Sequence, residues 1–218
     1  MFVHCSKNDI KNYENAQAEW ARYSKTDDIL YGMCRSWPHH KDLGIVQAKV
    51  TIIARTYAAG IERKGGKDKA IGILETITNI LHKNAGWIDP RIIELKRLRR
   101  FSSSSAVKVL QMHGDLVRLL RSGTKSKINF RSFVSKYLHF HTPIVPIFDS
   151  LSSQTINKPD WYPWREYRSR AFIGLQRPFD KTYYRFLMQF LFCFLDLQEL
   201  GLNPSVRRVD YFLIDSAP

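Results

Sequence analysis

The sequence predicts an all-α fold, and three observations lead to that prediction. Apolar residues recur every three or four positions through most of the chain, which is the spacing of one helix face. No stretch shows the alternation of apolar and polar residues that is typical of a half-buried strand. Short connections marked by Gly, Pro or Asp separate about nine such segments. Together these features favour a compact multi-helix domain.

Most of the predicted helices start at a polar capping residue and stop at a glycine or a proline. Asp42, Asp149 and Asp180 are predicted N-caps, and Asp89 followed by Pro90 is predicted to start another helix. Gly86, Gly123 and Gly201 are predicted to end helices. The expected helices cover roughly residues 8–23, 27–37, 43–62, 68–85, 89–100, 105–120, 130–140, 149–156, 180–200 and 205–215.

The chain length of 218 residues fits one all-helical domain, or two lobes of about 1–122 and 123–218 with a cleft between them. The very apolar stretch Phe186–Leu197 is too short to span a bilayer, so it predicts a buried core helix and no membrane partner. Three widely spaced cysteines disfavour a disulfide framework and a Cys-ligated metal. With the lack of a signal peptide, they predict a cytoplasmic location, associated with the nucleoid if the source is bacterial.

Neither a metal nor a small-molecule cofactor is expected. Adjacent residues on an extended chain point to opposite sides, so His39 and His40 would chelate one ion poorly and are interpreted as a polar loop. No G-x-G-x-x-G or Walker loop occurs in the sequence, which gives no support to nucleotide-dependent phosphoryl transfer.

The balance of charge indicates a nucleic-acid partner. Lys and Arg number 34 against 20 Asp and Glu, which gives a formal net charge of +14, and aromatic residues are frequent among the basic clusters. The alternative is a basic protein that has no nucleic-acid partner. The predicted nucleic-acid contacts lie in the two most basic loops and at the start of the central segment: Lys125, Lys127, Arg131, Arg165, Arg168 and Arg170.

One unit of the sequence could carry chemistry. Lys136 lies in an aromatic-rich amphipathic segment, the Pro-containing turn HTPIVP follows, and Asp149 stands where a new helix should begin. A lysine becomes a nucleophile when its amine is neutral, which burial favours, and a nearby carboxylate can steady the positive charge that develops on a substrate. The other interpretation is an ordinary surface lysine followed by an ordinary N-cap.

This unit resembles the helix-hairpin-helix DNA glycosylases, in particular the lyase branch that excises 8-oxoguanine. In that family a lysine opens the second hairpin helix, a Pro-containing turn follows, and an aspartate starts the next helix, which matches Lys136, Pro143–Pro146 and Asp149. The resemblance covers about residues 128–156 and implies a helix-hairpin-helix-like unit. The sequence departs from the family where a Gly-hydrophobic-Gly turn is usual, because it has Phe133-Val134-Ser135. The interval between lysine and aspartate is also shorter than usual.

The resemblance implies a DNA glycosylase and AP lyase that acts on a damaged or modified purine. Lys136 would form a Schiff base at C1′ and Asp149 would assist, on a base flipped out of double-stranded DNA. The candidates for the base pocket are Phe140, His139, His141, Trp161 and Trp164. The alternatives are a non-catalytic nucleic-acid-binding protein on the same scaffold and a helical interaction or toxin-like factor, for which Arg131 and His139 could suggest a ribonuclease.

Overall fold

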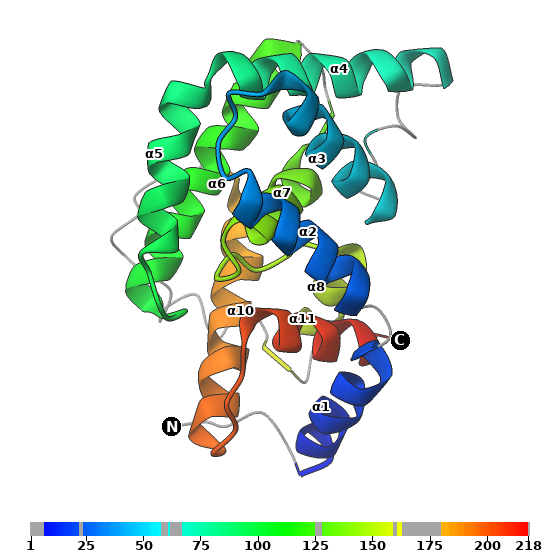
Figure 1. Ribbon diagram of the computed structural model, residues 1–218. Coiled ribbons are helices and arrows are strands. Elements are labelled where there is room, and N and C mark those ends of the chain that lie inside the picture. The colour runs from blue at the N-terminus through cyan, green and yellow to red at the C-terminus, as the bar shows by residue number, and fades with distance from the viewer. Residues whose placement is uncertain are drawn as a thin grey trace.

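The computed structural model describes residues 7–21, 24–57, 61, 67–124, 128–158, 161–162 and 180–217. Within these ranges the chain forms ten helices and no strand, which confirms the predicted all-α class (Figure 1). The helices are α1 Lys7–Trp20, α2 Ser24–Ser36, α3 Leu43–Thr56, α4 Lys67–Lys83, α5 Ala85–Lys96, α6 Ser103–Thr124, α7 Arg131–His141, α8 Ser150–Ile156, α10 Lys181–Glu199 and α11 Val206–Asp215.

The predicted aspartate caps are present. The side chain of Asp42 accepts the backbone N–H of Ile45, Asp149 accepts that of Leu151, and Asp180 accepts two N–H groups of the first turn of α10. Gly201 follows α10 with φ of 80°, a conformation that L side chains rarely adopt, and it ends the helix as predicted.

The predicted helix start at Asp89 and Pro90 is wrong. Helix α5 begins at Ala85 and contains both residues, and it follows α4 after the single residue Asn84. The Asp89 carboxylate does not cap the helix because it accepts hydrogen bonds from His40, at 2.5 Å from the ring Nδ1 and 3.3 Å from the backbone N–H. His40 is correspondingly buried and does not form the polar loop that the sequence suggested.

Two glycines predicted to end helices lie inside them. Gly86 is the second residue of α5, and Gly123 lies one residue before the end of α6. A Cβ at Gly123 would come within 2.5 Å of the Ile80 side chain of α4. This glycine therefore serves the close packing of α6 on α4, and it does not end the helix.

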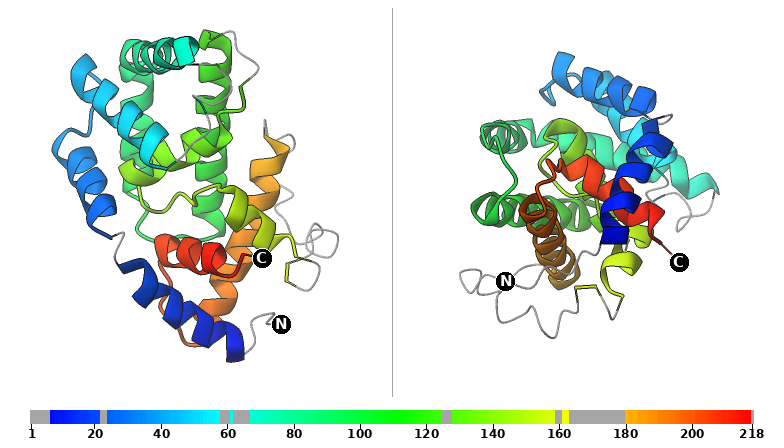
Figure 2. Two further views of the ribbon diagram at one scale, coloured as in Figure 1. Left: turned by 90° about the vertical axis from the view of Figure 1, so that its right-hand side faces the viewer. Right: turned by 90° about the horizontal axis from the view of Figure 1, so that it is seen from below.

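Helix α7 lies at the centre of the molecule, where α2, α3, α5 and α6 pack against it (Figures 1 and 2). Residues 133–141 are buried without a break, as expected for a helix covered on every side. The short helix α8 packs on α10 and α11, and α1 packs along α11. Because α7 contacts four helices from before residue 122, this central helix joins the two parts of the chain. The division into two lobes stays a prediction.

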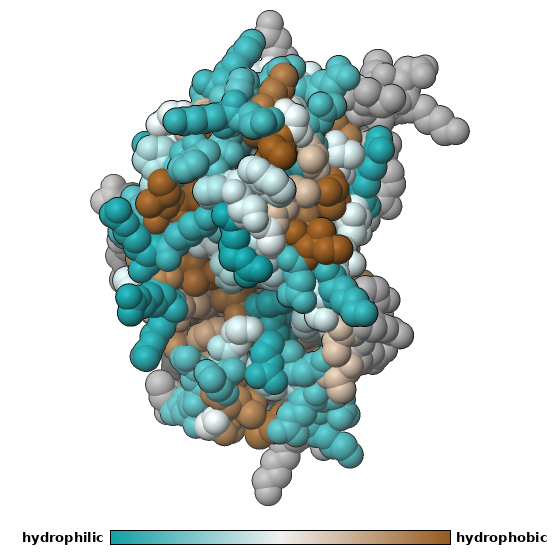
Figure 3. Space-filling view, viewed as in Figure 1, coloured by the Kyte–Doolittle hydropathy of each residue, from teal (hydrophilic) through white to brown (hydrophobic). Residues whose placement is uncertain are grey.

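The surface of the face shown in Figure 1 is mainly hydrophilic, with apolar residues in separate patches (Figure 3). The predicted core helix at 186–197 is the middle of α10, where Phe186, Phe190 and Phe194 are buried. Among the described residues, no helix combines the length and apolarity needed to cross a bilayer.

Candidate functional site

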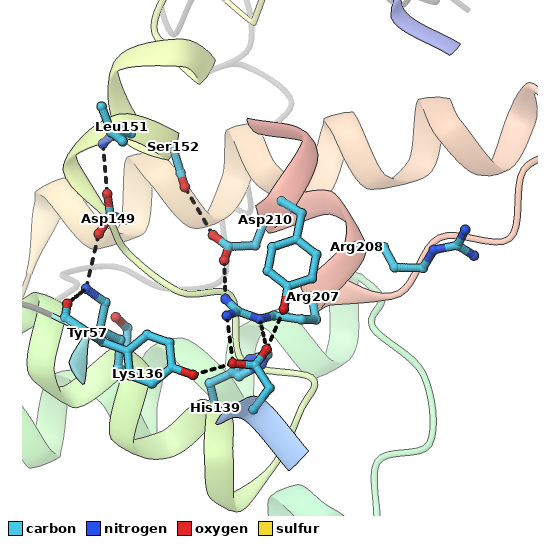
Figure 4. Close-up of polar contacts among 12 residues, drawn as sticks. Tyr57, Lys136, His139, Asp149, Leu151, Ser152, Arg207, Arg208 and Asp210 are labelled. Atoms are coloured by element: carbon cyan, nitrogen blue, oxygen red, sulfur yellow. Dashed lines mark hydrogen bonds and ion pairs between the residues drawn. The ribbon is translucent and has the colours of Figure 1, made fainter. Parts of the chain in front are cut away.

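The structure brings Lys136 and Asp149 together. Lys136 lies in the middle of α7, and its Nζ is 3.1 Å from Oδ2 of Asp149, the N-cap of α8 (Figure 4). The same amine donates a 2.7 Å hydrogen bond to the backbone carbonyl of Tyr57. The Lys136 side chain is 3% exposed and that of Asp149 is 26% exposed. The pair is thus a buried amine whose carboxylate partner reaches solvent.

The turn between α7 and α8 is held against α7 by side chains of α7 itself. Ser135 Oγ accepts the backbone N–H of Phe148 at 2.9 Å, directly before Asp149. Nδ1 of His139 lies 2.7 Å from the carbonyl oxygen of Val145. Because a carbonyl oxygen only accepts, Nδ1 carries the proton and donates this hydrogen bond. These two contacts and the N-cap bond to Leu151 fix where the Asp149 carboxylate lies.

Lys136 and Asp149 belong to a ring of residues from five helices, joined by polar contacts and, between Asp149 and Ser152, by the backbone of α8 (Figure 4). Tyr57, whose carbonyl binds Lys136, donates through its hydroxyl to Asp27 of α2. Arg207 of α11 then joins two carboxylates, since it donates to Asp27 at 2.6 and 3.0 Å and to Asp210 at 2.5 Å. Ser152 of α8 donates to Asp210 at 3.0 Å, and the backbone of α8 between Asp149 and Ser152 completes the ring.

The electrostatics of the ring are set by Arg207 and by burial. Burial acts to raise the pKa of Asp27, but the hydrogen bonds and charge of Arg207 hold it below its usual value. Burial raises the pKa of Asp210 to about 6, although Arg207 opposes the change. The ring therefore contains one carboxylate held firmly ionised and one that titrates close to neutrality.

Three of the five residues predicted for the base pocket lie in the core around α7. His139 is fully buried, with Nε2 paired to the hydroxyl of Tyr31, and burial lowers its pKa to about 3. Phe140 is buried against the rings of Tyr31 and Tyr57. His141 is buried against His40 and Tyr137, and its ring nitrogens have no hydrogen-bond partner.

The other predicted contacts are divided between described and undescribed parts of the chain. Trp161 stacks on Phe212, with ring centroids 5.4 Å apart. Arg131 forms a bidentate ion pair with Asp180, at 2.7 and 2.8 Å, so its guanidinium is already paired within the protein. The remaining predicted residues lie outside the described residues: Lys125, Lys127, Trp164, Arg165, Arg168 and Arg170.

The other members of the ring were not predicted from the sequence, namely Tyr57 as a partner of Lys136 and the cluster of Asp27, Arg207 and Asp210. A signal was present in α11, where Arg207 and Asp210 are three residues apart and interrupt an apolar segment, VRRVDYFLID. Spacing along one helix can suggest that pair, but only the tertiary fold brings Asp27 to it from 180 residues away.

The structure brings an amine and a carboxylate together at this site: Nζ of Lys136 lies 3.1 Å from Oδ2 of Asp149, and Asp149 is the member of the pair that reaches solvent. Within the described ranges, no group of three or more His, Cys, Asp or Glu side chains is placed to hold a metal ion. Comparisons of this chain with family models, curated proteins and solved structures found no match.

Proposed function

We propose that the protein is a DNA glycosylase with AP lyase activity that acts on a damaged or modified purine, with Lys136 as nucleophile and Asp149 as its proton acceptor. The observation that supports the proposal most is the 3.1 Å contact between a 3% exposed lysine and a partly exposed carboxylate at a helix start. The strongly basic composition and the resemblance of residues 128–156 to the lyase branch of the glycosylases support DNA as the substrate.

The proposed reaction begins when Lys136 gives a proton to Asp149 and attacks C1′ of the target nucleotide. The new N–C1′ bond replaces the glycosidic bond, whose electron pair leaves with the purine, and the proton that the attacking nitrogen loses goes to the purine. The bond between C1′ and O4′ then opens, Asp149 passes its proton to O4′, and a protonated imine is left on Lys136. The Asp149 carboxylate finally takes the C2′ proton, and the 3′ phosphate leaves, which cleaves the strand.

This reaction needs a local rearrangement around the amine. Lys136 donates to Tyr57 and to Asp149, so after a proton passes to Asp149 the lone pair still points at that carboxyl group, and the amine must turn away from Asp149 to reach C1′. The target base must also leave the duplex to bring C1′ to this depth.

A second candidate, a non-catalytic nucleic-acid-binding protein, is favoured by the same two hydrogen bonds. An amine that is held by a carbonyl and a carboxylate and is 3% exposed also has the geometry of a structural ion pair. This candidate predicts salt-sensitive DNA binding without a covalent intermediate.

Borohydride trapping tests the proposal. We expect the native protein to form a reduced cross-link with a duplex containing 8-oxoguanine and with a duplex containing an abasic site. Lys136→Gln should abolish both cross-links, and Asp149→Asn should slow their formation by about 10²- to 10⁴-fold, the usual contribution of a general base.

The matched control is Lys49→Gln, because Lys49 and Lys136 are the two buried lysines among the described residues. The control should retain the cross-link. Trapping at the abasic site alone would indicate a lyase that acts on another base. If the native protein traps neither duplex but binds both, the non-catalytic candidate replaces the proposal.

A further inference from the structure

Two hollows flank the first turn of α10 and share Lys181 and Thr182 as lining residues. The larger has a volume of about 720 Å³ and lies between α8 and α10, and the smaller has about 420 Å³ and lies between α10 and the end of α6. We call the two hollows together the α10 groove. The larger volume falls in the range of small-molecule and nucleotide sites.

The α10 groove is strongly cationic. Among its described lining residues, four cationic side chains face one carboxylate: Arg121, Arg131, Lys181 and Arg185 against Asp180. Arg131 and Asp180 neutralise each other, while Arg121, Lys181 and Arg185 are exposed and have no ion-pair partner among the residues that the structure describes.

Two other hollows on the molecule are electrically balanced. The one lined by Asp115 and Arg118 contains an ion pair between them, and the one lined by Glu94 and Lys108 contains another. The excess positive charge is therefore a feature of the α10 groove and does not simply follow from the basic composition of the chain.

The α10 groove adjoins the candidate site through Phe148, the residue before Asp149. The Phe148 ring lies 5.0 Å from the Arg131 guanidinium in the smaller hollow and 5.1 Å from the Phe186 ring in the larger one. Ser153, which also lines the larger hollow, donates its backbone N–H to the carbonyl of Asp149 at 3.0 Å. The groove thus passes within one helical turn of Asp149.

The lining of the larger hollow suits one nucleotide unit. Lys181 and Arg185 provide charge for phosphates, Tyr184 provides an aromatic ring, and two further polar side chains, Ser153 and Asn157, can hydrogen-bond to a base or sugar. Exposed cations with an aromatic side chain among them form the usual surface for a nucleic-acid strand.

We infer that the α10 groove binds the phosphodiester backbone of one DNA strand beside Asp149, with one nucleotide unit in the larger hollow against Tyr184. The inference rests on the proposed function for the choice of DNA. It adds the surface that holds the strand, whose unpaired cations lie on α6 and α10, outside the unit on which the family resemblance rests.

The test measures binding of the full chain to a duplex that contains a stable abasic-site analogue, by fluorescence anisotropy over a range of salt concentrations. The slope of log K against log salt is negative. We expect it to become less negative by about 0.9 in each of the variants Arg121→Gln, Lys181→Gln and Arg185→Gln. The factor by which affinity falls between 50 and 200 mM salt should thus be about threefold smaller for each contact removed than it is for the native protein. Tyr184→Leu should lower affinity on the order of tenfold with an unchanged slope, because stacking releases no counterions.

The matched controls are Arg35→Gln, Lys83→Gln and Arg97→Gln, which remove exposed cations that line neither hollow. The inference is overturned if these controls change the slope as much as the groove variants, or if the native protein does not bind the duplex. Borohydride trapping at saturating DNA separates this result from the proposed function. If the groove variants show a weaker salt dependence of binding but the native protein forms no cross-link, the inferred DNA-binding surface is supported and the proposed glycosylase and lyase activity is contradicted.

Discussion

The two buried lysines of the described residues lie in the same core and differ in their partners. Lys49 of α3 is fully buried and donates to the carbonyl of Trp37, and no carboxylate in the described part of the chain forms an ion pair with it. Lys136 of α7 is also buried, but it contacts a carboxylate that is itself partly exposed. The two side chains therefore separate the effect of burial from the effect of a charged partner.

The difference teaches that a buried amine with a lowered pKa is not by itself a reactive site. Burial lowers the pKa of Lys49, and the positive charge of Lys96 lowers it further against the opposing effects of Cys34 and Asp89. That amine is fully enclosed, so no substrate can approach it. Lys136 has a proton acceptor at 3.1 Å and an exposed edge next to it, and these two features make it the better candidate.

The largest effect that we expect on stability is that of Asp149→Ala. This change leaves the Lys136 ammonium buried without its counter-charge, which should destabilise the protein by about 3–5 kcal/mol. Asp42→Ala is the matched control, because Asp42 is an exposed N-cap of α3 and should cost about 1 kcal/mol. Urea unfolding at pH 7 measures both, and equal losses would contradict a role for the ion pair beyond capping.

Asp210→Asn extends the comparison to a buried charge of opposite sign. The folded-state pKa of about 6 lies roughly two units above the usual value of about 3.9, so the folded protein binds this proton more tightly than the unfolded chain. Ionisation of Asp210 therefore costs stability, and the cost is absent below about pH 4 and complete above about pH 6. The groups that face it are Arg207, Asp149, Lys136 and the hydroxyl of Ser152.

The stability of Asp210→Asn relative to the native protein should thus rise by about 3 kcal/mol between pH 3.5 and pH 7. Unfolding in denaturant at several pH values measures this difference. Asp27→Asn provides a control of opposite sign, because Arg207 holds the pKa of Asp27 below its usual value and the stabilisation is lost as pH falls. A difference for Asp210→Asn that does not change with pH would refute the raised pKa.

Much of the helical framework could be predicted from local sequence, because caps and apolar periodicity act within a few residues. The Asp149 cap depends on the next two residues, and the buried position of Lys49 follows from its place on the apolar stripe of α3. The prediction of a helix start at Asp89 was wrong because it depended on a distant residue. His40, 49 residues away, forms a hydrogen bond with the Asp89 carboxylate. Local rules could not anticipate a competing hydrogen bond of that kind.

The candidate site divides in the same way. The sequence analysis paired Lys136 with Asp149 because 13 residues and one turn separate them. It could not find Tyr57, Asp27 or Arg207, whose contacts join α3, α2 and α11 and depend on how the helices pack. His139 looked like a pocket residue, but its imidazole holds the carbonyl of Val145, a role that only the path of the turn can show.

The smallest of these stability effects, and the one that completes the comparison, is expected for Lys49→Met. A folded-state pKa below the usual value of about 10.4 means that the unfolded chain binds this proton more tightly, so the charge costs stability until pH rises past that value. Methionine removes the cost but leaves the Trp37 carbonyl without its donor, so we expect a net gain on the order of 1 kcal/mol at pH 7. The gain over the native protein should shrink as pH rises toward about 10.4, because Lys49 loses its proton in the folded state before it does so in the unfolded chain. Chemical denaturation of both proteins at pH 7 and pH 10 measures the change. A loss of equal size at both pH values would show that the hydrogen bond to Trp37 outweighs the buried charge, and Lys49 would then join Lys136 as a lysine that its partner stabilises.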